Sequence, residues 1–411
     1  MIKKTIINDP VYGFITIPSQ LIAEIISHPF FQRLRHIKQL GMTHYVYPGA
    51  LHTRFQHALG AMHLMGKVLD NLRMKGIGIS KEEYEASQIS ILLHDIGHGP
   101  FSHTLEDTLL SGTKHESLSY LFIDNLNAQL NGALDLTLKI FRNTYTRKFF
   151  HQLVSSQLDI DRLDYLTRDC FFTGVQEGTI GVDRIIAMLM IHNDQLVVEE
   201  KGIYSIENFL NARRMMYWQV YLHKTSVSAE RMLVNVMRRA QALVRADETL
   251  QASNALLYFL KKQATLNDFK EDDSLLQHFG SLDDNDIWGA LKCWQHHRDH
   301  ILSLLSRMLL QRELFKVKLS IEPIRKNEIE SIIAAVMKKF EILRSEANYL
   351  FSHGTVTNEA YAEGHHINIL MRSGELRDIA QASDLPNIKA ISKIVKKNYL
   401  CWPKNVYLLN S

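Results

Sequence analysis

The densest group of chemically capable side chains is the ten-residue string from His94 to His103, which reads His-Asp-Ile-Gly-His-Gly-Pro-Phe-Ser-His. It places two metal-ligating residue types, His94 and Asp95, side by side at the end of a predicted helix, where a glycine lets the backbone turn. A His-Asp pair alone arises by chance in many chains. Three histidines, two glycines and a proline within ten residues are a much stronger signal, and we interpret the string as part of a metal site.

Two further candidate ligands lie far from this string along the chain. His57 belongs to the segment Thr53–Gly60, and Asp161 belongs to Leu158–Tyr165. Imidazole and carboxylate together suit Mn, Fe, Ni, Co or Zn, and carboxylates also suit Mg. A set of four ligands leaves coordination positions open for water and substrate, and two aspartates balance the charge of a dication. The sequence therefore predicts a divalent metal that polarises a phosphoryl oxygen and lowers the pKa of a bound water.

Simpler interpretations of these two residues stay open at this point. A single histidine such as His57 on a half-apolar helix is more often a packed side chain than a ligand. Asp161 starts a polar stripe at helical spacing, and a solvated helix face has the same pattern; the stripe continues through Asp164, Tyr165 and Arg168. The opposite face of that segment carries leucines, so we expect the helix to be half-buried. The nearby string favours the metal interpretation.

Composition limits the class of protein. With 411 residues and 46% hydrophobic content, the chain is long enough for two to three domains with a large core. A net charge of +3 gives no strong signal for nucleic-acid binding. We find no apolar run long enough for a membrane span and no signal peptide at the start. Three widely spaced cysteines argue against a disulfide framework and fit a reducing cytoplasm.

Hydrophobic periodicity predicts a mainly α fold with small β-hairpins. Hairpins are expected over 2–18 and 190–204, and a short β patch over 314–321. Helices are expected over 54–75, 82–96, 101–110, 114–128, 133–142, 147–170, 205–223 and 226–246. We place a soft boundary near 245, which separates a core of residues 1–245 from a mostly helical C-terminal region of residues 246–411.

Several linked segments of this chain resemble the HD-domain dNTP triphosphohydrolases, a family of multi-helix metal enzymes. The resemblance covers roughly residues 6–240, with the HD motif region at about 50–170. The matching segments are Asn8–Pro10, Phe31–Gly41, Tyr47–Ala50, Arg54–Gly60, His94–His103, His115–Glu116, Asp161–Cys170 and Arg213–Lys224. The resemblance implies hydrolysis of deoxynucleoside triphosphates to deoxynucleoside and triphosphate. It also implies assembly into homodimers or homotetramers.

The resemblance assigns roles residue by residue. The metal ligands would be His57, His94, Asp95 and Asp161. His98 would lie beside the phosphate and the attacking water, and His115 would be the general acid, oriented by Glu106. The family often has Asp at this last position, so the longer Glu changes the geometry. Substrate-binding positions would be Gln39, Leu40, Arg54, His103, Tyr165, Asp169, Arg213, Tyr217 and Tyr221.

A regulatory nucleotide site of the vertebrate members, which bridges subunits, is matched only in part. Gln32, Arg35 and Lys201 match positions of that site. Other positions depart from it, because the chain has Ser27 where the family has a guanine-reading Asp, and Thr5 and Glu199 where it has basic residues. These departures argue against a guanine-nucleotide activator of the same kind.

Two alternatives to a dNTPase share the same four ligands. One is an HD-type nucleotidase or phosphodiesterase that acts on another phosphate ester. The other is a nucleotide-binding sensor that keeps the HD fold without turnover. The pocket positions argue against the first only through the resemblance, and the presence of His98, Glu106 and His115 argues against the second.

Overall fold

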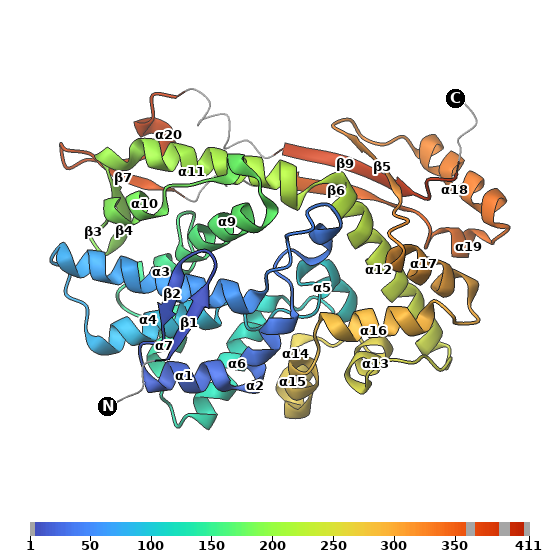
Figure 1. Ribbon diagram of the computed structural model, residues 1–411, viewed down its shortest axis with the longest axis horizontal. Helices are drawn as coiled ribbons and strands as arrows, with labels where there is room; N and C mark the ends of the chain where they lie inside the picture. Colours follow the sequence, from blue (N-terminus) through green and yellow to red (C-terminus); the bar gives the residue numbers. More distant parts are fainter. Residues whose placement is uncertain (1–4, 359–365, 386–394, 407–411) are drawn as a thin grey trace.

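The structure is a computed structural model of the chain that describes residues 5–358, 366–385 and 395–406. Helices dominate these residues, and their strands form three small sheets (Figure 1). The predicted mainly helical fold is therefore confirmed. The N-terminal hairpin is confirmed as well, as an antiparallel pair of β1 (Ile6–Asp9) and β2 (Gly13–Thr16).

The first half of the described chain consists almost entirely of helices. In order, they are α1 (Gln20–Ser27), α2 (Pro29–Gln32), η1 (Arg33–His36), η2 (Gly41–Tyr45), α3 (Arg54–Met74), α4 (Lys81–Leu93), α5 (His103–Leu109), α6 (His115–Gln129), α7 (Asp135–Phe141), α8 (Phe149–Val154), α9 (Ile160–Thr173), η3 (Gln176–Gly178) and α10 (Val182–Met188). The chain between α4 and α5 is the string with the predicted metal ligands.

Helix α3 is the central element of this half and packs against both α4 and α9. It starts at a capping box, in which the Thr53 N–H is bonded to Gln56 Oε1 at 2.9 Å. Gly60 lets α9 approach closely, because a Cβ there would lie 2.1 Å from side-chain atoms of both Asp164 and Arg168. The side chains of α3 and α9 that face each other thus meet in the core.

The helix predicted over 147–170 is wrong as a single element. The structure divides it into α8 and α9, with an irregular segment at residues 155–159. Asp159 is the N-cap of α9, where its carboxylate accepts the N–H groups of Ser156 and Arg162, both at 2.8 Å. A serine–aspartate segment offers the backbone hydrogen bonds that compete with a continuous helix, and the hydrophobic periodicity does not reveal this.

The second half mixes helices with the two larger sheets. Its elements are β3 (Leu189–His192), β4 (Gln195–Glu199), η4 (Glu200–Gly202), α11 (Ile203–Met216), the π-helical η5 (Tyr217–Tyr221), α12 (Lys224–Arg245), α13 (Asn254–Lys261), α14 (Leu266–Glu271), α15 (Asp273–Gly280), α16 (Asp284–Trp294), α17 (His300–Leu310), β5 (Lys316–Ser320), α18 (Lys326–Phe340), α19 (Arg344–Ala347), β6 (Ser352–Asn358), β7 (Asn368–Leu370), β8 (Leu376–Asp378), α20 (Ile379–Ala382) and β9 (Val395–Trp402). None of the helices in the described ranges is long and apolar enough to cross a membrane.

The predicted hairpin at 190–204 and the β patch at 314–321 are confirmed as β3–β4 and β5. Each gains partners that the periodicity does not predict. Strand β4 pairs in parallel with β7, which extends the hairpin to the order β3-β4-β7-β8, and β9 lies between β5 and β6. Residues beyond 350 therefore complete sheets begun earlier in the chain. The boundary near 245 stays a prediction.

Candidate metal centre and active-site cavity

Four side chains from three distant segments meet at one point. His57 comes from α3, His94 and Asp95 directly follow α4, and Asp161 comes from the first turn of α9. The Nε2 atoms of His57 and His94 lie 3.4 Å apart. Asp161 Oδ1 lies 3.2 Å from the first and 3.3 Å from the second, and Asp95 Oδ1 lies 3.4 Å from His94 Nε2. The predicted ligands are thus brought together.

The partners of the two imidazoles test whether this group suits a cation. His57 Nδ1 lies 2.7 Å from Asp164 Oδ2, and His94 Nδ1 lies 2.6 Å from the carbonyl oxygen of Ile91. Both partners only accept, so each Nδ1 carries the proton and donates it, which leaves both Nε2 lone pairs facing the cluster. Two lone pairs and two carboxylates turned towards one point repel each other unless a cation lies between them. The group therefore fits a divalent metal.

Asp164 is a member of a buried network behind His57. Its side chain and that of Arg168 are both fully buried, so the alternative of a solvated helix face is wrong for them. Arg168 donates to Asp164 Oδ1 at 3.0 Å and Oδ2 at 2.9 Å, and to Asp9 Oδ2 at 2.8 Å. The N-terminal hairpin is in this way tied to the carboxylate that fixes the tautomer of His57.

The carboxylates create a strongly negative environment. Burial alone lowers the pKa of His57, but without a cation between these groups the carboxylates of Asp161 and Asp164 outweigh burial and raise it to about 10. Burial likewise raises the pKa of Asp161, yet His57 and His94 hold it well below its usual range. Positive charge is therefore stabilised at this point, as a metal-binding group requires.

Arg54 lies beside the predicted metal ligands. It lies three residues before His57 on α3 and is hydrogen-bonded to Asp95 and, from Nε, to Ser102 Oγ at 2.7 Å. Ser102 and its neighbour Phe101 have φ values of 52° and 54°, in the left-handed region that non-glycine residues rarely adopt. Strained backbone of this kind persists where surrounding contacts impose it, and it clusters at functional sites. Here it presents Ser102 to the guanidinium.

Two buried groups hold the 94–103 string from behind. Arg33 donates to the carbonyl oxygens of Ile96 at 2.7 Å and His98 at 2.8 Å. It is 6% exposed, so its charge is buried against the backbone of the string. Asp284, at the start of α16, accepts the N–H groups of Phe101 at 2.8 Å and Lys38 at 3.0 Å. A residue from the second half of the chain therefore helps to fix the backbone of residues 94–103, which we call the ligand loop.

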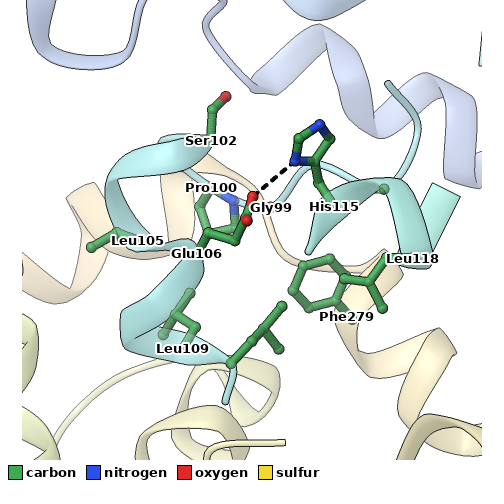
Figure 2. Close-up of a pocket in the computed structure, with 11 residues that line it drawn as sticks. Gly99, Pro100, Ser102, Leu105, Glu106, Leu109, His115, Leu118 and Phe279 are labelled. Atoms are coloured by element: carbon green, nitrogen blue, oxygen red, sulfur yellow. Dashed lines mark hydrogen bonds and ion pairs between the residues drawn. The ribbon is translucent and has the colours of Figure 1, made fainter. Parts of the chain in front are cut away.

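A second group of histidines lies beside the metal ligands. The rings of His98 and His115 are stacked, with centroids 3.8 Å apart and planes inclined by 16°. His115 Nδ1 lies 3.0 Å from Glu106 Oε2, and Figure 2 shows the two side chains pointing towards each other, with Phe279 of α15 beside them. His103 Nδ1 lies 3.7 Å from the same carboxylate oxygen. The predicted group of His98, Glu106 and His115 is brought together.

The pKa shifts of His98 and Glu106 indicate different roles for the side chains of this second group. Burial is the largest cause of the lowered pKa of His98, and Arg54 lowers it further, so this ring is neutral. Burial raises the pKa of Glu106, but its hydrogen bonds with His103 and His115 outweigh burial and hold it well below its usual range. An ionised Glu106 accepts the Nδ1 proton of His115 and leaves Nε2 available for proton transfer.

A cavity of about 570 Å³ lies in front of both groups. Most of the predicted residues line it: Gln39, Leu40, Arg54, Asp95, His98, His103, His115, Asp161, Tyr165, Asp169, Tyr217 and Tyr221. Arg213 is not among the lining residues and donates to Gln157 Oε1 at 2.9 Å. Arg162, Glu230 and Arg231 line the cavity and were missed from the sequence. For Arg162, the position directly after the predicted ligand Asp161 was the one sequence feature that could have indicated a place in the cavity wall.

Asp169, one of the predicted substrate-binding residues, lines the cavity together with Tyr217 and Tyr221. It is 1% exposed, and its two oxygens lie 2.7 Å from His52 Nε2 and 2.8 Å from the Tyr221 hydroxyl. Tyr221 meets Tyr217 edge to face, with ring centroids 5.2 Å apart. Gln39 Oε1 is buried and has no hydrogen-bond partner among the residues that the structure describes. An unpaired acceptor in this wall suits a ligand hydroxyl.

The predicted regulatory residues do not form one group. Arg35 Nε donates to Gln32 Oε1 at 2.8 Å, and its guanidinium lies 3.6 Å from the ring centre of Phe55. Lys201 belongs to η4, which packs against α10 and α11. Figure 1 shows α10 well apart from α2, the helix that carries Gln32. Within this chain, Lys201 is therefore separate from the other two residues.

Comparison with known proteins agrees with this geometry. Residues 54–169 match the HD domain, and residues 180–257 match the HD associated region. A phosphohydrolase from Bacteroides thetaiotaomicron has a crystal structure that superposes with a TM-score of 0.94 at 50% identity, covering 98% of this chain and all of that one. The uncharacterised protein YwfO of Bacillus subtilis is 30% identical over 98% of this chain and 93% of its own.

A relative with a named activity is also similar. The deoxynucleoside triphosphate triphosphohydrolase SAMHD1 homolog of Dictyostelium discoideum is 30% identical over 61% of this chain and 51% of its own. The chain belongs to the HD superfamily of metal-dependent phosphohydrolases. The metal itself is not identified by its ligands, because the same set suits several divalent ions.

Proposed function

We propose that this protein hydrolyses deoxynucleoside triphosphates to the deoxynucleoside and triphosphate. The observation that carries the proposal is the lining of one cavity. Two predicted ligand carboxylates, a histidine placed for proton transfer and most of the predicted substrate-binding residues line it together. The names of relatives such as the Dictyostelium homolog support the same substrate class.

The proposed metal would be held by His57, His94, Asp95 and Asp161. When bound, it would supply charge stabilisation to a phosphoryl oxygen and a lowered pKa for water. Arg54 would hold the α-phosphate beside this centre, because its guanidinium already bonds to Asp95. Arg162 would meet the remaining phosphates at the same wall, since it directly follows Asp161 and lines the cavity. Guanidinium groups suit phosphate oxygens in charge and in geometry.

Proton transfer to the leaving group would come from His115. Water attacks the α-phosphorus and loses one proton to solvent, the bond from phosphorus to the 5′-oxygen breaks, and the Nε2 proton of His115 passes to that oxygen. Glu106 holds Nδ1 of the ring at 3.0 Å and stabilises the charged imidazolium before transfer. His98 stacks on this ring and stays neutral because of burial and Arg54, so it does not compete for the proton.

Selection of deoxyribose would depend on the opposite wall. Asp169, already paired with the Tyr221 hydroxyl, would accept a hydrogen bond from the 3′-hydroxyl. Leu40 would lie against the 2′ position, where a ribose hydroxyl needs extra space, and the unpaired Gln39 acceptor would face the 3′-hydroxyl instead. Tyr165 lies on α9, four residues after Asp161. It lines the cavity and would pack on the sugar.

The proposal is tested by incubating the purified protein with Mn²⁺ and each dNTP, and separating the products by ion-exchange chromatography. We expect deoxynucleoside and intact triphosphate in equal amounts, and much slower turnover of the matching rNTPs. Release of dNMP with pyrophosphate, or of orthophosphate alone, would show a nucleotidase or pyrophosphatase reaction instead. Nucleotide binding without any product would identify a sensor.

A further inference from the structure

A charged pair on α12 lines the active-site cavity without a role in the chemistry proposed above. Glu230 and Arg231 are consecutive residues in the first half of this helix, and both are half-buried. They line the same cavity as Asp161 and Tyr221. Helix α12 contributes none of the four predicted metal ligands and no member of the His115–Glu106 pair. Charged groups in a cavity wall need polar partners, and these two are positioned to find them in a ligand.

The surroundings place this pair next to the sugar side of the cavity. Tyr221 and Leu222 lead into α12 and line the cavity together with the pair. Helix α12 also packs against η2, whose Thr43 belongs to the same lining. A nucleotide with its sugar at Asp169 and Tyr221, and its phosphates at the metal ligands, would extend its base towards this part of the wall.

The pair is supported from outside by the C-terminal sheet. The guanidinium of Arg231 lies 5.4 Å from the ring centre of Tyr399 on β9, a cation–π contact. On the same strand, Lys397 lies 3.8 Å from the ring centre of Trp218, in the π-helical segment that carries Tyr221. Burial raises the pKa of Glu230 to about 7, with Arg231 opposing this shift. Hydrogen bonds donated by a ligand would stabilise the ionised form of this carboxyl group.

We propose that Glu230 and Arg231 read the base of the nucleotide and favour guanine. Guanine has two adjacent donors, N1–H and N2–H, which match the two oxygens of one carboxylate. It also presents O6 and N7, the acceptor pair that a guanidinium recognises with two parallel bonds. No other common base offers both patterns. The inference rests on the proposed function, and it assigns the C-terminal sheet a part in substrate choice through Tyr399.

The test compares kcat/KM for dGTP, dATP, dCTP and TTP in the wild type and in Glu230→Gln. A carboxamide turns an N–H group towards a guanine donor, so we expect dGTP hydrolysis to fall by about ten- to a hundredfold, as for a lost bidentate base contact. The other three dNTPs should change by less than about threefold. Arg245→Gln, an exposed change on the same helix, is the matched control. Tyr399→Leu should reduce the guanine preference by a smaller factor.

A second measurement separates this inference from the proposed function. Equilibrium binding of dGMP, dAMP, dCMP and dTMP by calorimetry needs no turnover, and we expect dGMP to bind most tightly in the wild type but not in Glu230→Gln. Absence of triphosphate from every dNTP would refute the proposed function, while the binding panel would still decide base reading. Equal affinities in the wild type, or an equal loss for all four bases in the variant, would overturn the inference.

Discussion

Two groups of histidines and carboxylates lie side by side in this protein, with similar residue types and similar separations. One contains His57, His94 and Asp161, and the other contains His98, Glu106, His115 and the exposed His103. In the first group the Nδ1 protons of both rings are directed to acceptors outside it, so the Nε2 lone pairs converge. In the second group the carboxylate is itself the acceptor of the Nδ1 proton of His115.

Ring orientation separates the two groups further. A metal lies in the plane of each imidazole that binds it, along the lone pair. The rings of His57 and His94 are inclined by 74°, so their planes can meet at one ion, whereas those of His98 and His115 are stacked at 16°. Nearly parallel stacked rings with centroids 3.8 Å apart do not direct their lone pairs to one such point. Hydrogen-bond partners and ring planes, more than residue types, favour a metal ion in the first group and the proposed proton transfer in the second.

The largest effect should come from removing a ligand of the first group. Asp161→Asn keeps the size of the side chain but removes the charge that faces both imidazoles. We expect bound metal, measured by ICP mass spectrometry, and phosphohydrolase activity both to fall below detection. Asp183→Asn makes the same chemical change at an exposed carboxylate and should alter neither. A variant that kept full metal content would place Asp161 outside the ligand set.

Substitution in the second group should lower activity without loss of metal. His115→Gln removes the proton donor but no metal ligand, so we expect unchanged metal content and a fall in kcat of about 10²- to 10⁴-fold, the range for general acid–base catalysis. Substrates with a better leaving group than the 5′-oxygen should lose less. His278→Gln, at an exposed histidine of α15, is the control. Metal loss together with activity would mean that the two groups are one site.

The sequence predicted the members of both groups, but not what distinguishes them. The ligand identities followed from the 94–103 string together with the resemblance, and the structure brings those residues together. Asp164 fitted a solvated stripe equally well, since its role depends on α3 and α9 touching at Gly60. Arg33 and Asp284 act on the ligand loop through tertiary contacts that hydrophobic periodicity does not encode. The local sequence pattern thus predicted which residue types form the site. The histidine tautomers and the shape of the 94–103 loop depend on tertiary contacts, which only the fold shows.

The same reasoning explains why Glu230 and Arg231 were missed. They lie on α12, whose periodicity shows only that one face is buried, and no motif marks them. Their position in the cavity arises because η5 and β9 bring the start of this helix to the sugar side. The strands β6, β7 and β9 were missed for a related reason: they pair with partners far along the chain, and such pairing is weakly marked in short segments.

The smallest of the three effects should come from the residue that fixes the tautomer of His57. Asp164→Asn retains an oxygen that can accept the Nδ1 proton but loses the charge that strengthens this bond, so we expect metal affinity to fall by about 10- to 100-fold. Titration with a competing chelator measures it. Glu83→Gln is the matched control, because Glu83 is also buried and bonded to an arginine, Arg147, but lies away from the ligands. Both variants should lose stability in denaturant, since each weakens an arginine–carboxylate pair. Only Asp164→Asn should weaken metal binding, and equal affinities in the two variants would show that the orientation of His57 does not depend on this carboxylate.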